Sequence, residues 1–76
     1  MISATQCRAA RAILDWTQDQ LAEKAGVGVV TVRQFEQASS EPRRATLAVL
    51  KAALEAAGVE FLEMDGVRRN PTAHKV

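Results

Sequence analysis

The chain has 76 residues, of which 47% are hydrophobic and 4% aromatic, and its formal net charge is +1. This length allows one domain with a small core and excludes a second domain. No apolar run is long enough to span a bilayer, no signal-peptide pattern is present, and Cys7 has no cysteine partner, so we expect a reducing, cytoplasmic location.

The first helix is expected over residues 4–15. Ser3 is a good N-cap, and Gln6 lies three residues later, which is the spacing of a capping box. The apolar side chains that follow recur at helical spacing and should share one buried face. They are Cys7, Ala10, Ile13 and Leu14. We expect Cys7 to be a small, buried apolar residue of this face.

Residues 18–37, with the sequence QDQLAEKAGVGVVTVRQFEQ, have the pattern of two short helices joined by a tight turn. Thr17 and Gln20 repeat the capping-box spacing at the start of this segment. Gly26 follows the first of the two helices, where the backbone is expected to need positive φ. The second is expected over residues 29–37, and packing must stabilise it because its β-branched residues are mediocre helix formers.

A fourth helix is expected over residues 43–57, and the pattern changes after it. The buried stripe of this helix should consist of Leu47, Leu50, Leu54 and Ala57. Residues 59–62 then lose the helical period, and Asp65 and Gly66 form a turn pair, so we predict a short β-hairpin whose second strand follows the turn. A fifth helix over residues 59–64 is the competing interpretation.

With these elements, the chain resembles the Cro/C1-type (XRE-like) helix-turn-helix regulators over about residues 2–58. The motif at 18–37, the run LDWTQDQLAEKAGV and the PRRATL opening of the fourth helix carry the resemblance. It implies a mainly α, compact lambda-repressor-like DNA-binding domain of four or five helices. This domain, with a short C-terminal β-strand or hairpin, should cover residues 1–69, followed by a flexible tail at 70–76.

The function that the resemblance implies is sequence-specific binding of double-stranded DNA by a homodimeric transcriptional regulator, which we expect to be a repressor. The helix at 29–37 would lie in the major groove. Arg33 and Gln34 point away from the expected core face; arginine can bond guanine O6 and N7, and glutamine can bond adenine N6 and N7. Val29, Val30 and Thr31 complete the base-contacting set, although valine can touch only a thymine methyl group.

Three residues are expected to contact phosphate. Gln18 has this role in the family, or else it braces side chains of the third helix. Arg43 and Arg44 place like charges at a helix N-terminus, where they oppose the helix dipole and favour a counter-anion. The family also often pairs an arginine late in the first helix with an acid near the end of the third, and Arg11 and Glu36 match those places. We expect an ion pair between them.

The sequence holds no set of residues with the spacing of a catalytic or metal site. A nucleophile–base set, a phosphate-cradling glycine loop and a metal-ligand spacing are all missing, and His74 has no partner motif. We therefore expect no enzyme activity, no catalytic residue, no metal and no cofactor. The expected partners are double-stranded DNA, at the nucleoid, and a second copy of the chain, with no membrane or small-molecule ligand.

The alternative function is a protein-interaction module, such as an antitoxin or adaptor, that keeps the fold but binds DNA weakly. Val29 and Val30 motivate it, because exposed valines suit a protein partner. Two surfaces could form the dimer contact. The C-terminal strand could pair with its twin across a two-fold axis, or small residues of the fourth helix could form a helical contact. These small residues are Val49, Ala52, Ala53 and Ala56.

Overall fold

The computed structural model describes residues 2–39 and 41–71. Within these ranges the chain forms the helices α1 (Ala4–Leu14), α2 (Gln18–Ala25), α3 (Val29–Glu36) and α4 (Arg44–Ala56), then the strands β1 (Val59–Phe61) and β2 (Val67–Arg69). This confirms a mainly helical fold with a C-terminal hairpin. The fifth helix considered for residues 59–64 is wrong, because residues 59–61 are a strand paired with β2.

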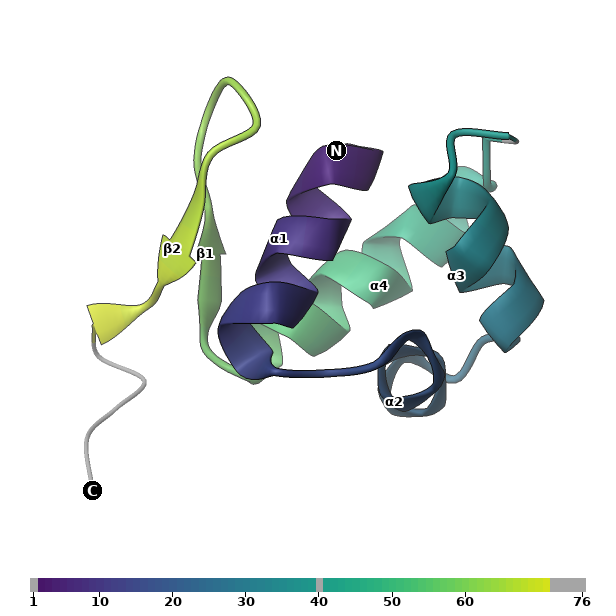
Figure 1. Cartoon of the computed structure of the whole chain (residues 1–76), viewed down its shortest axis with the longest axis horizontal. Coiled ribbons are helices and arrows are strands. Elements are labelled where there is room, and N and C mark those ends of the chain that lie inside the picture. Colours follow the sequence, from purple (N-terminus) through teal and green to yellow (C-terminus); the bar gives the residue numbers. More distant parts are fainter. Residues whose placement is uncertain (1, 40, 72–76) are drawn as a thin grey trace.

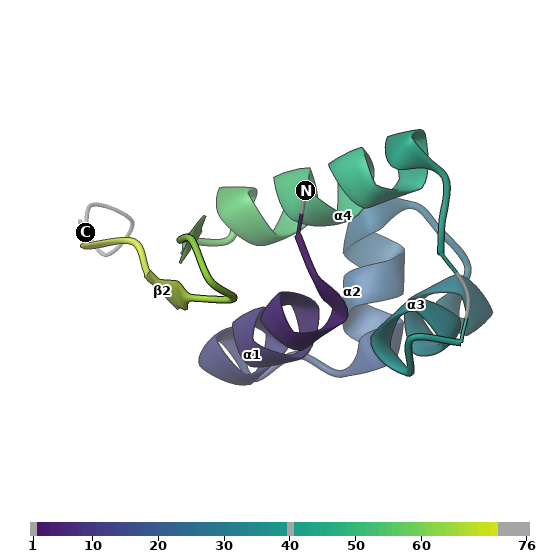
Figure 2. The same cartoon turned by 90° about the horizontal axis from the view of Figure 1, so that it is seen from above.

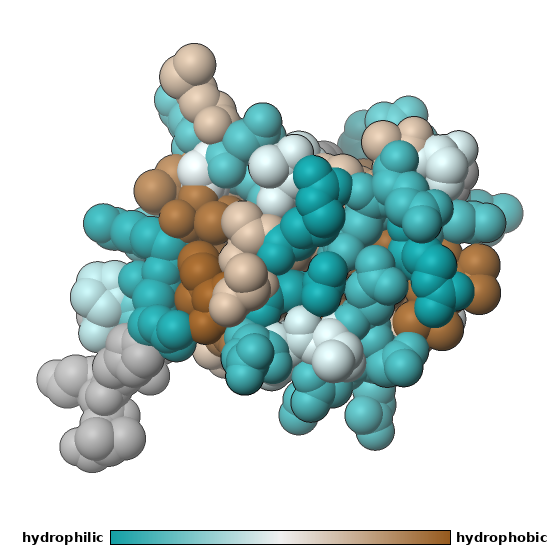
Figure 3. Space-filling model, in the orientation of Figure 1, coloured by the Kyte–Doolittle hydropathy of each residue, from teal (hydrophilic) through white to brown (hydrophobic). Residues whose placement is uncertain are grey.

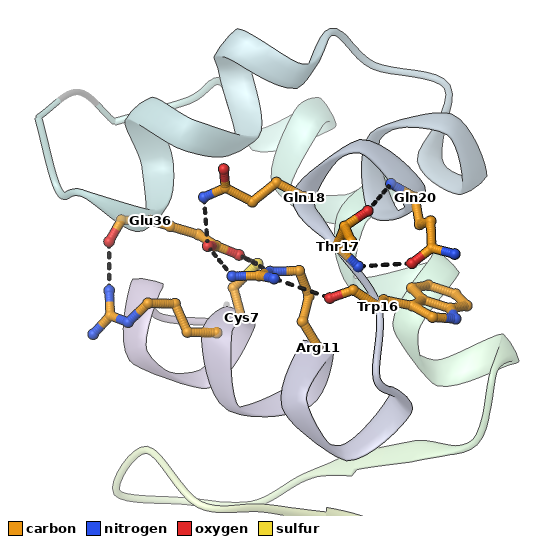
Figure 4. A network of polar contacts seen from close by, with 8 residues as sticks. Cys7, Arg11, Trp16, Thr17, Gln18, Gln20 and Glu36 are labelled. Atoms are coloured by element: carbon orange, nitrogen blue, oxygen red, sulfur yellow. Dashed lines mark hydrogen bonds and ion pairs between the residues drawn. The ribbon is translucent and has the colours of Figure 1, made fainter.

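The predicted capping signals set the starts of α1 and α2. The Ser3 hydroxyl accepts the backbone N–H of Gln6 at 3.1 Å, and the Gln6 side chain accepts the backbone N–H of Ser3 at 2.9 Å. Thr17 and Gln20 make the same reciprocal pair at the start of α2 (Figure 4). Gly26 ends α2 with a φ of 73°, which confirms the expected left-handed conformation.

The helical ends differ from the predicted ones by single residues. α1, α3 and α4 each stop one residue early, because Asp15, Gln37 and Ala57 serve as C-caps rather than as helical residues. Asp15 has a φ of 59°, a conformation that aspartate tolerates better than most residues.

The hairpin and the helix-turn-helix lie at opposite ends of the molecule. Figures 1 and 2 show α1 and α4 between them, with α2 and α3 at one end and β1 and β2 at the other. Side chains from several of these elements meet in one core. Its largest fully buried members are Leu21, Leu50, Leu54, Val32, Val59 and Cys7. Cys7 is therefore the buried apolar residue that its place on α1 predicts.

The hairpin turn is displaced by one residue from the predicted pair. The residues with positive φ are Met64, at 58°, and Asp65, at 63°, and the backbone N–H of Gly66 donates to the carbonyl of Glu63 at 3.1 Å. Met64 and Asp65 are thus the central residues of the turn. The strands pair antiparallel within the chain, with Phe61 opposite Val67.

Polar contacts attach the hairpin to both ends of α1. The buried Gln6 amide donates to the carbonyl oxygens of Leu62, at 2.9 Å, and Gly66, at 3.0 Å, so this capping residue also holds the turn. At the other end of α1, the Arg69 guanidinium donates to the carbonyl of Ile13 at 2.6 Å. The hairpin therefore contacts α1 at both ends and stabilises its position.

Asn70, the first residue of the predicted tail, is hydrogen-bonded to the hairpin segment. The backbone N–H of Asn70 donates to the carbonyl of Gly58 at 2.7 Å, which continues the hairpin by one residue. Residues 72–76 of the predicted tail, including His74, lie outside the described residues.

Candidate nucleic-acid interface

One face of α3 is exposed to solvent along its whole length. Val30, Arg33, Gln34 and the C-cap Gln37 are exposed, and their spacing of i, i+3, i+4 and i+7 places them in one stripe. Arg33 and Gln34 thus face outward as the sequence suggests. Gln37 was not among the predicted base-contacting residues, although its position four residues after Arg33 could have identified it.

The opposite face of α3 is buried and supports the helix from behind. Val32 is fully buried, and Phe35 and Glu36 are 7% and 4% exposed. Val29 and Thr31 flank the stripe: both are half-buried, and Val29 packs against the core. Of the predicted base-contacting residues, Val30, Arg33 and Gln34 lie on the outward stripe, while Val29 and Thr31 lie at its edges.

The Glu36 carboxylate is the centre of a buried polar network that positions the end of α3 (Figure 4). The structure brings Arg11 and Glu36 together in a two-pronged ion pair, with Nε to Oε2 and Nη2 to Oε1 both at 2.7 Å. The third guanidinium nitrogen, Nη1, donates to the carbonyl of Trp16 at 3.0 Å. This geometry matches the fork of a guanidinium to a carboxylate and so defines the relative placement of α1 and α3.

Three further donors complete this network. The Gln18 amide donates to Oε1 of Glu36 at 3.0 Å. Gln18 therefore braces a side chain of α3, which was the alternative to a phosphate contact. The Cys7 thiol donates to Oε2 at 3.1 Å, and the Arg8 guanidinium donates to the backbone carbonyl of Glu36. Sequence analysis did not identify Cys7 and Arg8 as partners of Glu36, although both share the helical face of Arg11 at spacings of four and three residues.

The network keeps Glu36 ionised. Burial raises the pKa of Glu36, but hydrogen bonds from Arg11, Gln18 and Cys7 and the positive charge of Arg11 outweigh this effect, so the pKa is lowered from its ordinary value of 4.5. The hydrogen bond to Glu36 in turn raises the pKa of Arg11. Burial and the bond to Glu36 raise the pKa of the Cys7 thiol, which therefore stays a protonated donor at neutral pH.

The start of α4 presents two exposed cations beside the end of α3. Arg43 is the N-cap of α4 and Arg44 its first residue, and the first turn contains no acid. Arg44 lines a surface groove together with Phe35 and Ala38, so it lies near the C-terminal end of α3. Within residues 2–39 and 41–71, neither arginine takes part in an ion pair.

The described residues offer neither a metal-binding cluster nor a membrane-spanning helix. No group of three or more histidine, cysteine, aspartate or glutamate residues that could hold a metal ion occurs among the described residues. None of the helices in this part has the length and apolar composition needed to cross a membrane.

The chain matches a known protein family. No curated protein shows significant sequence similarity to the chain. A family model described as helix-turn-helix matches residues 8–64, which is most of the chain and contains α2 and α3 entirely. The chain therefore belongs to the Cro/C1-type helix-turn-helix family, whose members are DNA-binding regulator domains rather than enzymes.

Proposed function

We propose that the protein is a homodimeric, sequence-specific transcriptional regulator that inserts α3 into the DNA major groove. The observation that carries this proposal is the outward stripe of α3, on which Val30, Arg33 and Gln34 are exposed while Val32 is fully buried behind them. A helix whose polar side chains face solvent and whose back is anchored by a core can enter the groove without losing its position.

The proposed roles follow from side-chain chemistry. Arg33 would bond guanine O6 and N7, and Gln34 would bond adenine N6 and N7. Arg43 and Arg44 would contact phosphates, because two exposed cations at a helix start attract an anion. The free backbone N–H groups at the start of α2 would bind a further phosphate, with Gln18 holding Glu36 beside them.

Repression is the regulatory outcome that we propose. A dimer bound across two half-sites about one helical turn apart, roughly 34 Å, occupies the DNA that a polymerase would need. Regulation would then depend on protein concentration, self-association or another protein. Because the proposed target is DNA, the protein would act in the cytoplasm at the nucleoid.

A salt titration tests the phosphate contacts. Changing Arg43 and Arg44 together to alanine should weaken binding of every duplex about equally. It should also reduce the slope of the logarithm of the binding constant against the logarithm of salt concentration by about 0.9 for each lost contact. Electrophoretic mobility shift at several salt concentrations measures both quantities.

The control is Arg68→Ala, which removes one positive charge, half of that lost in the double variant, from the hairpin at the other end of the molecule. Its ion pair with Glu60 is exposed, so this variant should fold and bind as the wild type does. Equal slopes for the wild type and the double variant would show that these arginines do not contact phosphate. Wild-type binding that is absent at low salt would instead favour the adaptor or antitoxin function that exposed Val30 suggests.

The surface that we propose for the homodimer is the outward face of α4. Its exposed residues are small and recur at helical spacing: Ala45, Ala48, Val49, Ala52 and Ala56. Small side chains allow two helices to approach closely. Ala53, considered for this face from the sequence, packs against the core instead. The strand alternative would instead use the outer edge of β1 or β2, which their pairing within the two-stranded sheet leaves open.

Placing a charge on this face should separate the protomers. Ala52→Glu would bury a carboxylate in an apolar contact, so we expect a shift from dimer to monomer in sedimentation equilibrium at micromolar concentration. Ala12→Glu, on the exposed side of α1, is the control and should leave the dimer intact. A dimer that persists in Ala52→Glu would place the contact elsewhere on the molecule.

A further inference from the structure

An exposed valine lies among polar residues on the outward stripe of α3. Val30 is 54% exposed, and Arg33 and Gln34 follow it at the i+3 and i+4 positions of the same face. Figure 3 shows a small hydrophobic area at the edge of the molecule where α3 begins in Figure 1, with hydrophilic side chains around it. An isolated apolar group of this kind favours a partner that offers one small apolar group between polar ones.

The major groove of DNA presents such a group. Each base pair displays hydrogen-bond donors and acceptors there, and the only apolar group on the base edges is the C5 methyl of thymine. A single valine has too little area to form the apolar centre of a protein interface, which normally requires several large side chains. The polar neighbours of Val30 therefore match base edges better than they match a protein.

Gly28, two residues before Val30 and the N-cap of α3, is required neither by a left-handed backbone nor by lack of space for a side chain. Its φ of −75° and ψ of 146° are open to any residue, and a Cβ added there would meet no atom within 4 Å. A serine or aspartate would cap α3 better, because α3 has no side-chain cap. A missing side chain at this position does, however, let an external surface approach the first turn of α3. Valine is shorter than arginine and needs that approach to reach a base.

We propose that Val30 makes the protein specific for a thymine by packing against its C5 methyl group, and that Gly28 is the residue that permits this approach. The inference rests on the proposed function, since it assumes that α3 lies in the major groove. It goes further by naming the base and the chemical group that are recognised. Each half-site should then contain a thymine that cannot be replaced without loss of affinity.

Replacing thymine by uracil tests the inference, because the two bases differ only in the methyl group. The preferred duplex is first selected with the full chain from a random pool, and each thymine is then replaced in turn. At one thymine per half-site, uracil should weaken binding about fourfold, the fold-change that corresponds to burying one methyl group. In Val30→Ala, affinity for the thymine duplex should fall and the difference between thymine and uracil should disappear.

Met64→Ala provides the matched control, because Met64 is a 97% exposed apolar residue at the hairpin turn, far from α3. This variant should keep the full difference between thymine and uracil. If no thymine shows a uracil effect, or if Val30→Ala keeps the effect, the inference is wrong while the proposed function stands. If the wild type binds no duplex even at low salt, the proposed function and the inference fail together.

Gly28→Leu tests the approach separately. It adds bulk without any hydrogen-bonding group at a position that is open inside the chain, so the fold should persist with a slightly lower thermal unfolding midpoint, because leucine is a poorer N-cap than glycine. Binding of the selected duplex should fall more than tenfold, since the added side chain holds the first turn of α3 away from the bases. Unchanged binding by the folded variant would show that the glycine does not serve close approach.

Discussion

Replacing Arg11 by methionine is expected to lower the free energy of unfolding by about 3–5 kcal/mol, the usual effect of breaking a buried ion pair on one side. Methionine has a comparable length and keeps much of the packing, but it leaves the Glu36 carboxylate, only 4% exposed, without its opposite charge. For a domain of this size, that loss is a large part of the total stability. Urea unfolding followed by circular dichroism measures it.

The control for Arg11→Met is Arg68→Met. Both variants remove an arginine whose Nε lies 2.7 Å from a carboxylate oxygen, but the Arg68–Glu60 pair is exposed. We therefore expect the control to change the free energy of unfolding by no more than about 1 kcal/mol. Similar losses in the two variants would mean that burial of Glu36 does not determine the effect.

The pH dependence of the same pair gives an independent check. Because the pKa of Glu36 is lowered by folding, its ionised form stabilises the protein above the ordinary value of 4.5, and this stabilisation is lost as pH falls through the folded pKa. In Arg11→Met the carboxylate no longer has its main partner. The difference in stability between wild type and variant should therefore shrink below about pH 4.5. A difference that is constant down to about pH 3 would contradict the linkage.

Arg33→Ala is expected to change which sequence the protein prefers. Losing a two-pronged contact to guanine should reduce discrimination at one base position by about 1–3 kcal/mol, or roughly 5- to 150-fold in relative affinity. The side chain is exposed, so the variant should fold normally. Competition binding with duplexes altered at each position identifies the base pair involved.

Arg43→Ala is the matched comparison, because it removes the same charge from a proposed phosphate contact. It should weaken all duplexes by a similar factor and leave their ranking intact. Arg33→Ala should instead flatten the ranking at one position. If both arginine variants leave the ranking unchanged, Arg33 is not a base-reading residue and specificity must come from Gln34, Val30 or DNA shape.

The hairpin and the end of the molecule that carries α3 are connected through α1. The amide of Gln6 holds the hairpin turn, and on the same helix Cys7 and Arg11 hold Glu36 at the end of α3. Gln6 precedes the region that the helix-turn-helix family model matches, which begins at residue 8. The hairpin therefore stabilises the helix on which the placement of α3 depends.

Local interactions made much of this fold predictable. The capping boxes at Ser3 and Thr17 involve residues three positions apart, and the left-handed backbone at Gly26 depends on one residue. Helical spacing alone also predicts the buried Leu47, Leu50 and Leu54 of α4. Ala57, the fourth residue predicted for this stripe, is instead the half-buried C-cap. The resemblance to the family added the pairing of Arg11 with Glu36, which no spacing within one helix indicates.

Tertiary packing decided the remaining features. The sequence of residues 59–61 is compatible with a helix or a strand, because a short apolar run occurs in both. Only pairing with β2 and the contact of the hairpin with α1 select the strand. The rotation of α3, which turns Val30 outward and half-buries Thr31, depends on how Val32 and Phe35 fill the core. The donors to Glu36 come from α1 and α2, and one of them is a cysteine thiol. A sequence states which groups can donate, but their meeting depends on the packing of helices that are distant along the chain.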